Sequence, residues 1–205
     1  MGLLIYVCGN WPVKVNRLSP DIYEIEDFIT VEQQAKILEY CKSLDESDWF
    51  HEETKGSFWY GKQNLEPSVD IFYELDKNVK KLFSNFLYIG DVALQRYLDK
   101  EPMQTHRDYW IKDLDYYIRY GIVIYYNDDY LGGEIEYPEL GIVHKPKARS
   151  LILHGGNILH GPKKVVGDSI RYFSTAFVRG SIDEPVFLNP CIFGDVIQDD
   201  GSNYP

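Results

Sequence analysis

The second half of the chain consists of short apolar stretches that end at glycine or proline, and this pattern limits the possible folds more than any other feature. Many short strands separated by Gly and Pro turns are typical of a β-sandwich or a β-barrel. The 17 tyrosines and 10 phenylalanines fit such a core, because aromatic side chains pack well on pleated surfaces. Turn-forming pairs include Gly132-Gly133, Gly155-Gly156 and Gly161-Pro162. Strands are expected at residues 92–98, 119–126, 134–137, 150–153 and 171–178.

A helix is expected before this β-region. Thr30 is followed three residues later by Gln33, which is the pattern of a capping box, where each side chain satisfies a backbone N–H of the first turn. Apolar residues then recur at helical spacing, so we expect a helix over residues 31–44. Strand-like stretches precede it at residues 3–8 and 23–28.

A second helix is expected to begin at Pro67 or Ser68 and to end at Gly90, with apolar residues along one face. Residues 45–66, between the two helices, are expected to form a loop or a hairpin. Helices followed by strands indicate an α+β fold in which the helices pack on one face of a β-core.

The length of 205 residues is enough for one domain with a sizeable core, and we expect that domain to span residues 1–205. Its β-core is expected at about residues 92–180. The N-terminal strand and helices then occupy residues 1–91, and residues 181–205 form a tail that lies over the domain.

Charge and cysteine content restrict the partners and the compartment. The formal net charge of -11 opposes general binding to nucleic-acid phosphates, so no nucleic-acid partner is expected. The apolar run at residues 3–8 is too short to span a bilayer and lacks a preceding basic segment, so no membrane association is expected. Cys8, Cys41 and Cys191 are few, odd in number and widely spaced, which indicates a reducing compartment and a cytoplasmic protein.

His106 and Asp108 are the first candidate metal ligands. On an extended segment, residues two apart point to the same face, so an imidazole and a carboxylate can meet one cation. A His-x-Asp motif alone is a weak signal, because it is common by chance. Two ligands do not hold a catalytic iron, and the 2-His-1-carboxylate set of a non-haem Fe(II) oxygenase requires a second histidine.

Four other histidines compete for that place, and the residues around each distinguish them. His51 neighbours two glutamates and is expected on the solvated surface, whereas His144 is expected at a strand edge. His154 and His160 flank a glycine-rich turn. We favour His160, because a Gly-Pro turn follows it and Arg171 then lies on the last strand.

Arg171 is the candidate for binding a carboxylate. Apolar and aromatic neighbours favour its burial over the alternative of a charge on the strand surface, and a buried arginine requires an anionic partner. A guanidinium pairs with a carboxylate in a bidentate manner. A 2-oxo diacid that chelates iron at one end needs such a cation for its distal carboxylate.

Taken in order along the chain, these pieces resemble the catalytic core of the prolyl 4-hydroxylase-like branch of the Fe(II)/2-oxoglutarate dioxygenases. The resemblance covers roughly residues 25–180 and includes the expected helix after Thr30. Each piece is short, but the ordered combination is far more specific than any one of them. The pieces are the strand Leu94-Gln95-Arg96-Tyr97, the motif His106-Arg107-Asp108, the strand and turn 124–130, the Gly-Gly-Glu hairpin 131–138, the turn Leu159-His160-Gly161-Pro162 and the segment Arg171-Tyr172.

The resemblance implies a fold and roles for five residues. The fold is a double-stranded β-helix, a jelly-roll or cupin-like core with N-terminal helices packed on one face. His106, Asp108 and His160 would bind Fe(II), and Arg171 would bind the distal carboxylate of 2-oxoglutarate. Tyr125 matches a tyrosine that helps to hold that carboxylate in several relatives, through a phenol that can donate a hydrogen bond. Simple packing in the core is an equal alternative for Tyr125.

The resemblance also implies a reaction. Fe(II), 2-oxoglutarate and O2, with ascorbate as an auxiliary reductant, would hydroxylate a peptidyl substrate such as a prolyl residue, or a small molecule, with release of succinate and CO2. Asp108 argues against halogenation, because halogenating relatives have a small residue at this position that leaves room for the halide.

The chain departs from the family pattern in three places. His154 stands where relatives have an aromatic or small apolar residue, so it is either a contact behind the ligands or the true distal ligand. The interval from His160 to Arg171 is one residue longer than in many relatives. Residues 109–118 are expected to form a loop, rich in aromatic and acidic residues, that borders the mouth of the site or packs as a lid.

Three alternatives account for part of the same pattern. A cupin-like or lectin-like β-barrel that only binds ligands explains the strands but leaves Arg171 a coincidence. A hydrolase that uses zinc or another metal would have similar ligands, with the metal activating water. A protein that has kept the fold but lost the activity is the third, and the intact ligand set argues against it.

Overall fold

The computed structural model describes most of the chain. The described residues are 3–8, 11–54, 57–62, 69–84, 88–89, 92–98, 104–108, 110–111, 116–180 and 186–193. In this part of the chain, no helix is both long and apolar enough to cross a bilayer.

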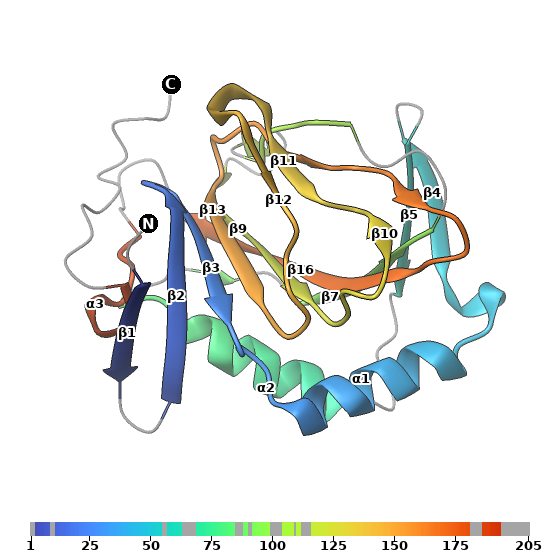
Figure 1. Ribbon diagram of the computed structural model, residues 1–205, viewed down its shortest axis with the longest axis horizontal. Helices are drawn as coiled ribbons and strands as arrows, with labels where there is room; N and C mark the ends of the chain where they lie inside the picture. Colours follow the sequence, from blue (N-terminus) through green and yellow to red (C-terminus); the bar gives the residue numbers. More distant parts are fainter. Residues whose placement is uncertain are drawn as a thin grey trace.

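A large antiparallel sheet of eleven strands, counted over the described residues, runs through the molecule (Figure 1). Two short strands, β6 (Tyr88–Ile89) and β8 (Trp110–Ile111), pair with β16 and β9 beside the main path. Along that path the strands follow the order β1 (Leu3–Cys8), β2 (Trp11–Ser19), β3 (Ile22–Glu26), β13 (Leu151–Gly155), β9 (Tyr116–Tyr125), β16 (Arg171–Gly180), β7 (Ala93–Tyr97), β5 (Ser57–Lys62) and β4 (Phe50–Thr54).

Smaller sheets lie over one side of this large sheet (Figure 1). One of them places β11 (Ile135–Tyr137) between β12 (Ile142–His144) and β14 (Gly161–Pro162). The other pairs β10 (Leu131–Gly132) with β15 (Val165–Val166). A buried cluster that includes Tyr125, Tyr137, Ile152 and Phe173 fills part of the space between the layers.

The helices cover the opposite side of the large sheet. The two longest, α1 (Val31–Ser43) and α2 (Val69–Lys80), run along it in Figure 1. Ile37 and Cys41 of α1 belong to a second buried cluster together with residues of α2 and of the sheet. Since side chains alternate along a strand, β9 and β16 supply both clusters from their two faces. The expected α+β fold with a double-stranded β-helix core is confirmed.

The first helix begins as its capping box predicts. The Gln33 backbone N–H donates to Thr30 Oγ1 over 3.1 Å, and the Thr30 backbone N–H donates to Gln33 Oε1 over 2.9 Å. A side-chain amide then ties the helix to the core, because Gln34 Nε2 donates to the carbonyl oxygen of Tyr126 over 2.7 Å. Residues 45–66 include a short 3-10 helix, η1 (Glu46–Asp48), and the β4–β5 hairpin, as expected.

The second helix ends ten residues earlier than predicted, at Lys80 rather than at Gly90. Phe83 instead forms an antiparallel bridge with Leu188, and the Ser84 backbone N–H donates to the carbonyl of Phe187 over 2.8 Å. These hydrogen bonds to the C-terminal segment replace further helical ones, and sequence periodicity does not reveal them. Pro67 and Ser68, where the helix was expected to begin, lie outside the described residues.

The prediction of a loop over residues 109–118 is wrong in part. Residues 110–111 form β8, and the residues from Tyr116 onward already belong to β9. Trp110 pairs with Tyr117, and Ile111 pairs with Tyr116. Residues 109 and 112–115 lie outside the described residues. The aromatic and β-branched side chains in this stretch suit a sheet edge as well as a loop.

The described part of the expected tail packs against the domain. It contains the short helix α3 (Pro190–Phe193), whose Ile192 and Phe193 are buried. The Phe193 ring meets the Tyr23 ring edge to face, with the centroids 5.1 Å apart.

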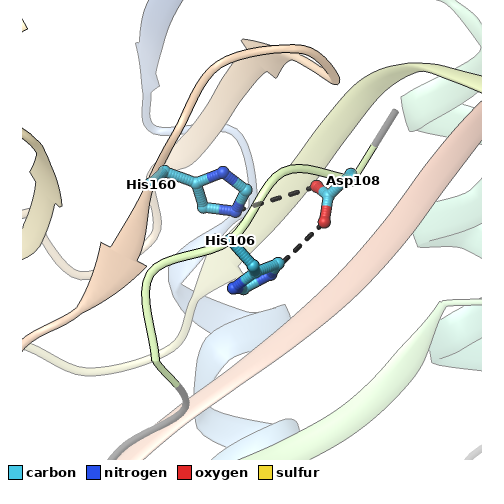
Figure 2. Close-up of side chains that lie close together, drawn as sticks. All are labelled: His106, Asp108 and His160. Carbon is cyan, nitrogen blue, oxygen red and sulfur yellow. Dashed lines mark ion pairs between the residues drawn. The ribbon is translucent and has the colours of Figure 1, made fainter. Parts of the chain in front are cut away.

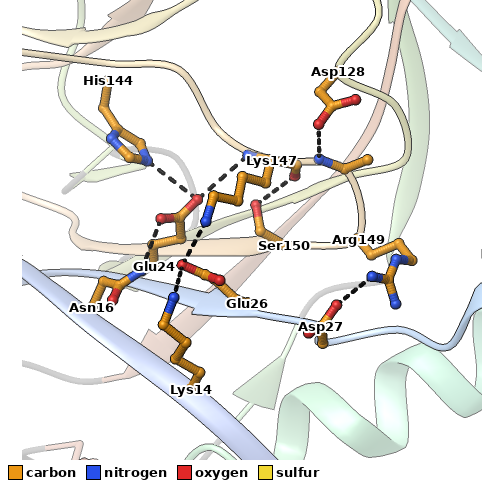
Figure 3. Close-up of polar contacts among 11 residues, drawn as sticks. Lys14, Asn16, Glu24, Glu26, Asp27, Asp128, His144, Lys147, Arg149 and Ser150 are labelled. Atoms are coloured by element: carbon orange, nitrogen blue, oxygen red, sulfur yellow. Dashed lines mark hydrogen bonds and ion pairs between the residues drawn. The ribbon is translucent and has the colours of Figure 1, made fainter. Parts of the chain in front are cut away.

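A polar cluster fastens β2 and β3 to the segment that follows β12 (Figure 3). Its centre is Glu24, which is only 2% exposed. His144 Nε2 lies 3.2 Å from Glu24 Oε1, and the Asn16 side-chain amide donates to Glu24 Oε2 over 3.3 Å. Burial alone would raise the pKa of Glu24, but these contacts and the Lys147 backbone N–H lower it on balance. His144 lies at the end of β12, as expected of a strand-edge histidine.

Candidate functional site

Two segments far apart in the sequence bring the predicted ligands together. His106 and His160 form an isolated antiparallel bridge, in which each backbone N–H donates to the other residue's carbonyl over 2.8 and 2.9 Å. The Asp108 backbone N–H donates to the carbonyl of Gly156 over 2.9 Å. The His106–Asp108 segment is therefore held against the chain on both sides of the glycine-rich turn.

The side chains of these three residues form the candidate metal-binding cluster found among the described residues. One donor atom from each of His106, Asp108 and His160 lies within 4.8 Å of the other two. His106 Nε2 is 3.3 Å from Asp108 Oδ1, and His160 Nε2 is 3.7 Å from Asp108 Oδ2 (Figure 2). Two imidazoles and one carboxylate on one side of a cation are the ligand set of non-haem Fe(II) oxygenases.

Backbone carbonyls determine which ring nitrogen of each ligand carries the proton. His106 Nδ1 lies 2.8 Å from the carbonyl oxygen of Gln104, and His160 Nδ1 lies 3.0 Å from that of Ile158. A carbonyl oxygen only accepts hydrogen bonds, so each Nδ1 is the protonated nitrogen. In both rings the lone pair is then on Nε2, which faces the cluster and is ready to bind a metal ion.

The electrostatics of the cluster keep the donors in metal-binding form. Burial would raise the pKa of Asp108, but the neighbouring imidazoles of His106, His154 and His160 hold it below its usual range. Burial lowers the pKa of His160 from 6.5 to about 3, and the neighbouring His154 adds to this effect. At neutral pH the carboxyl is therefore ionised and the imidazole is neutral.

Sequence reasoning missed a glycine that makes room for the cluster. Gly121 lies in β9 directly beneath it, and a Cβ at this position would lie 2.5 Å from both Asp108 Oδ2 and His154 Nε2. A glycine inside a strand pattern signals the close approach of another group, and this signal was available in the sequence.

The other histidines are placed differently. His154 lies in β13 beside the cluster, with Nε2 3.5 Å from Asp108 Oδ2, but it is not among the three grouped donors. His144 contacts Glu24 in the polar cluster and is not among the three grouped donors either. His51 is in β4, and its side chain lies outside the described residues, so its expected surface position stays a prediction.

A cavity of about 390 Å³ connects the cluster with Arg171. Its walls come from β7, β9, β13 and β16 on one side and from β11 and β14 on the other. Along β16 the alternate residues from Arg171 to Phe177 face the cavity, as strand geometry requires. The polar residues that line it include the His106–Asp108–His160 cluster, His154 and Arg171.

Arg171 is buried, as predicted, with 2% of its surface exposed. Its guanidinium carbon lies 4.6 Å from the centre of the Tyr97 ring and 4.5 Å from that of the Phe173 ring. Its Nη1 donates to the carbonyl of Gly133 over 2.8 Å. Among the described residues it forms no ion pair, and its Nε has no hydrogen-bond partner. A buried cation without an anion is costly, so this arrangement fits an anionic ligand.

The Gly132-Gly133 turn has a specific part in holding Arg171. Both glycines have positive φ values, 68° and 66°, which other residues rarely adopt. A Cβ on Gly132 would lie 2.2 Å from the carbonyl oxygen of Lys164. The turn thereby presents the Gly133 carbonyl to the guanidinium, which explains the glycine pair in the expected hairpin.

Tyr125 also lines the cavity close to Arg171. The guanidinium carbon lies 5.7 Å from the centre of the Tyr125 ring. Burial raises the pKa of Tyr125 to about 12, so the phenol is protonated at neutral pH and is available as a hydrogen-bond donor.

No protein-family model matches the chain, and no curated protein matches it. Solved structures do. A viral collagen prolyl hydroxylase from Paramecium Bursaria Chlorella virus-1, in complex with 2-oxoglutarate, is 16% identical with a TM-score of 0.55, and the match covers 78% of this chain and 96% of that one. A prolyl hydroxylase from Trichoplax adhaerens, in complex with a peptide of hypoxia inducible factor, is 12% identical with a TM-score of 0.63, covering 78% and 84% of the two chains.

A third structure broadens the comparison. HygX from Streptomyces hygroscopicus, with nickel and 2-oxoglutarate bound, is 12% identical with a TM-score of 0.56, covering 78% of this chain and 83% of that one. At these identities the likeness concerns the fold. The chain therefore has the double-stranded β-helix fold of the prolyl hydroxylases and related 2-oxoglutarate-Fe(II) oxygenases, which confirms the resemblance in fold that its motifs suggested.

Proposed function

We propose that this protein is a non-haem Fe(II)- and 2-oxoglutarate-dependent oxygenase that hydroxylates a peptidyl or small-molecule substrate. One observation carries the proposal: a single cavity contains a His-Asp-His cluster and a buried arginine without an anionic partner among the described residues. A metal ion alone would explain the cluster but not the arginine. A diacid that reaches from the metal to the arginine explains both.

In this proposal His106, Asp108 and His160 hold the metal. Three protein ligands leave coordination positions open for a co-substrate and O2. When bound, Fe(II) with 2-oxoglutarate and O2 supplies the oxidation of a substrate C–H bond, with release of succinate and CO2. The protein keeps His160 neutral and Asp108 ionised.

Arg171 and Tyr125 are the proposed partners of the distal carboxylate of 2-oxoglutarate. The planar guanidinium can pair with a carboxylate in a bidentate manner, and its unpartnered Nε is one of the available donors. The Tyr125 phenol is neutral and can donate a further hydrogen bond. The rings of Tyr97 and Phe173 both pack against the guanidinium and help to hold it in place.

The substrate class is proposed from the neighbours in fold and from Asp108. The Trichoplax enzyme was solved with a peptide and HygX has been solved with hygromycin B, so both substrate classes are represented on this fold. We therefore propose a peptidyl residue such as proline, or a small molecule. Hydroxylation is favoured because the Asp108 carboxylate occupies the position that halogenation would need for a halide.

The remaining assignments belong to the same proposal. We propose a single domain over residues 1–205, a cytoplasmic location and ascorbate as an auxiliary reductant. The cytoplasmic location is supported by the free cysteines: Cys41 and Cys191 form no disulfide in the described residues.

The test is turnover of 2-oxoglutarate to succinate with Fe(II), first without substrate and then with peptide and metabolite libraries. Wild-type protein is expected to release succinate, and His106→Ala and His160→Ala are expected to abolish it. His154→Ala is expected to retain much of it at saturating Fe(II). His144→Gln is a matched control, because it changes a histidine outside the cavity and keeps a donor near Glu24.

Two outcomes would overturn the proposal. Metal binding without any consumption of 2-oxoglutarate would favour a metal-dependent hydrolase or an inactive scaffold. Absence of Fe(II) binding would favour a cupin-like module without catalysis. Equal loss of succinate in His106→Ala, His154→Ala and His160→Ala would contradict the choice of His160 over His154.

A further inference from the structure

A third histidine stands beside the metal-binding cluster without belonging to it. His154 is 1% exposed and extends from β13 into the cavity wall. Its Nε2 lies 3.5 Å from Asp108 Oδ2, and its ring lies 4.0 Å from the His160 ring, centroid to centroid. A buried imidazole so close to the proposed ligand carboxylate requires an explanation that the ligand set itself does not provide.

The hydrogen bond on the far side of the ring determines where its proton lies. Tyr137 Oη is 3.4 Å from His154 Nδ1, and Tyr137 is fully buried. Burial raises the pKa of Tyr137 well above its usual value, so the phenol keeps its proton. Among the described residues, His154 is the hydrogen-bond partner found for this hydroxyl, which must donate to it or remain unsatisfied. His154 Nδ1 is then the acceptor, and the ring proton is on Nε2.

This tautomer is the opposite of the one that the two proposed ligands adopt. His106 and His160 donate from Nδ1 to backbone carbonyls and point the Nε2 lone pair at the metal position. His154 accepts at Nδ1 from a phenol and points a protonated Nε2 at Asp108 Oδ2. A protonated nitrogen does not bind a metal ion, but it donates a hydrogen bond to a carboxylate.

The backbone of β9 closes the contact from beneath. A Cβ on Gly121 would lie 2.5 Å from Asp108 Oδ2 and equally close to His154 Nε2. Only glycine at position 121 leaves space for both of these atoms. His154 also pairs with Gly121 across the sheet, so the register of β13 and β9 holds its ring above this position.

We propose that His154 is a positioning residue for the metal centre, donating from Nε2 to Asp108 Oδ2 while Tyr137 holds its tautomer. The inference rests on the proposed function, because it takes Asp108 as a metal ligand. With Oδ2 engaged by His154, Oδ1 is the oxygen left for the metal, and the carboxylate is oriented before the metal binds. Groups of this kind behind metal ligands are worth about 10- to 100-fold in metal affinity.

The first test observes the proton directly. The full chain, labelled with ¹⁵N-histidine and loaded with diamagnetic Zn(II), is studied by two-bond ¹H–¹⁵N correlation spectra, with assignments from single His→Gln variants. The expected result is a proton on Nε2 of His154 and a metal-bound Nε2 in His106 and His160. A proton on Nδ1 of His154, or a metal-bound His154 Nε2, would overturn the inference.

The second test measures the consequence for metal binding by Co(II) titration, followed through its visible absorption. His154→Gln places an amide donor near the former Nε2 and is expected to keep an affinity within about threefold of wild type. His154→Leu removes the donor and is expected to weaken binding about 10- to 100-fold, with an altered Co(II) spectrum. Tyr137→Phe leaves the ring without its tautomer partner and is expected to fall between these two.

The outcomes separate the inference from the proposed function. Wild-type protein that binds neither Zn(II) nor Co(II) would overturn the metal centre and, with it, the role of His154. Wild-type binding combined with an unchanged affinity and spectrum in His154→Leu would overturn only the role of His154. Equal weakening in His154→Gln and His154→Leu, with both variants folded by circular dichroism, would show that the hydrogen-bond donor is not the reason.

Discussion

Replacing Gly121 by alanine tests the geometry of the candidate metal centre with a single methyl group. The added Cβ would lie 2.5 Å from Asp108 Oδ2 and from His154 Nε2, whereas ordinary van der Waals contact begins at 3.4 Å. Unless the strand itself moves, both side chains must therefore retreat by about 0.9 Å. The side chains of His154 and Asp108 are only 1% and 8% exposed, and β9 lies between β13 and β16 in the sheet, so the strand has little freedom to move away.

The expected cost has two parts. Overpacking of a closely packed interior destabilises a protein by about 1–3 kcal/mol, which is visible as a lower midpoint of thermal unfolding. A displacement of about 1 Å in a catalytic arrangement can lower the rate about 100-fold. We therefore expect Gly121→Ala to remain folded, to bind Co(II) at least about tenfold more weakly, and to lose most of its succinate production.

The assay compares Gly121→Ala with Gly155→Ala. Gly155 is the last residue of the neighbouring strand β13. A Cβ on Gly155 would lie 3.2 Å from the Asn157 side chain, which can adjust, so this control is expected to keep near-wild-type Co(II) affinity. Gly121→Ala with wild-type affinity and wild-type turnover would refute the view that Asp108 and His154 are held in place over this glycine.

Three further predictions follow from particular contacts. Arg171→Leu is expected to raise the KM for 2-oxoglutarate at least about tenfold while Co(II) affinity is unchanged, because the guanidinium is the proposed carboxylate partner; an unchanged KM would contradict that role. The folded-state pKa of His160 is about 3, below its ordinary 6.5. Between these two pH values the imidazole is therefore protonated in the unfolded state and neutral in the folded state. The metal-free protein is therefore expected to keep this contribution to stability above pH 6.5 and to lose it as the pH falls toward 3. Thermal unfolding across this range should show a shallower pH dependence in His160→Gln. Thr30→Ala is expected to lower the free energy of unfolding by about 1 kcal/mol through loss of the helix cap, and Thr30→Ser to restore it, as measured by urea denaturation.

The elements that depend on neighbouring residues followed directly from the sequence. The Thr30–Gln33 capping box and the helix after it need only contacts within one turn, and both were predicted correctly. The strands of the core were also expected near their observed places, since alternation and flanking glycines act locally. The end of α2 was predicted wrongly, because the bridge between Phe83 and Leu188 joins residues far apart in the chain.

The residues of the candidate site likewise include some that local spacing brings together and others that only the fold brings together. His106 and Asp108 are two residues apart on an extended segment, so strand geometry alone placed their side chains together. His160 was a choice between histidines, and the backbone bridge with His106 brings it beside that pair. The motif order also pointed to Arg171, but its burial and its lack of an ion pair among the described residues appear only in the folded cavity.

The sequence by itself determined the β-rich α+β architecture, the capped first helix and the short list of residues able to bind a metal and a carboxylate. These depend on residue type and short-range spacing, which the chain carries before it folds. The sequence favoured His160 over His154, but only the tertiary structure showed that their Nδ1 atoms have different hydrogen-bond partners, the Ile158 carbonyl for His160 and the Tyr137 phenol for His154. The tertiary structure also explained why residue 121 is a glycine, since the side chains of Asp108 and His154 occupy the space that a larger residue would need.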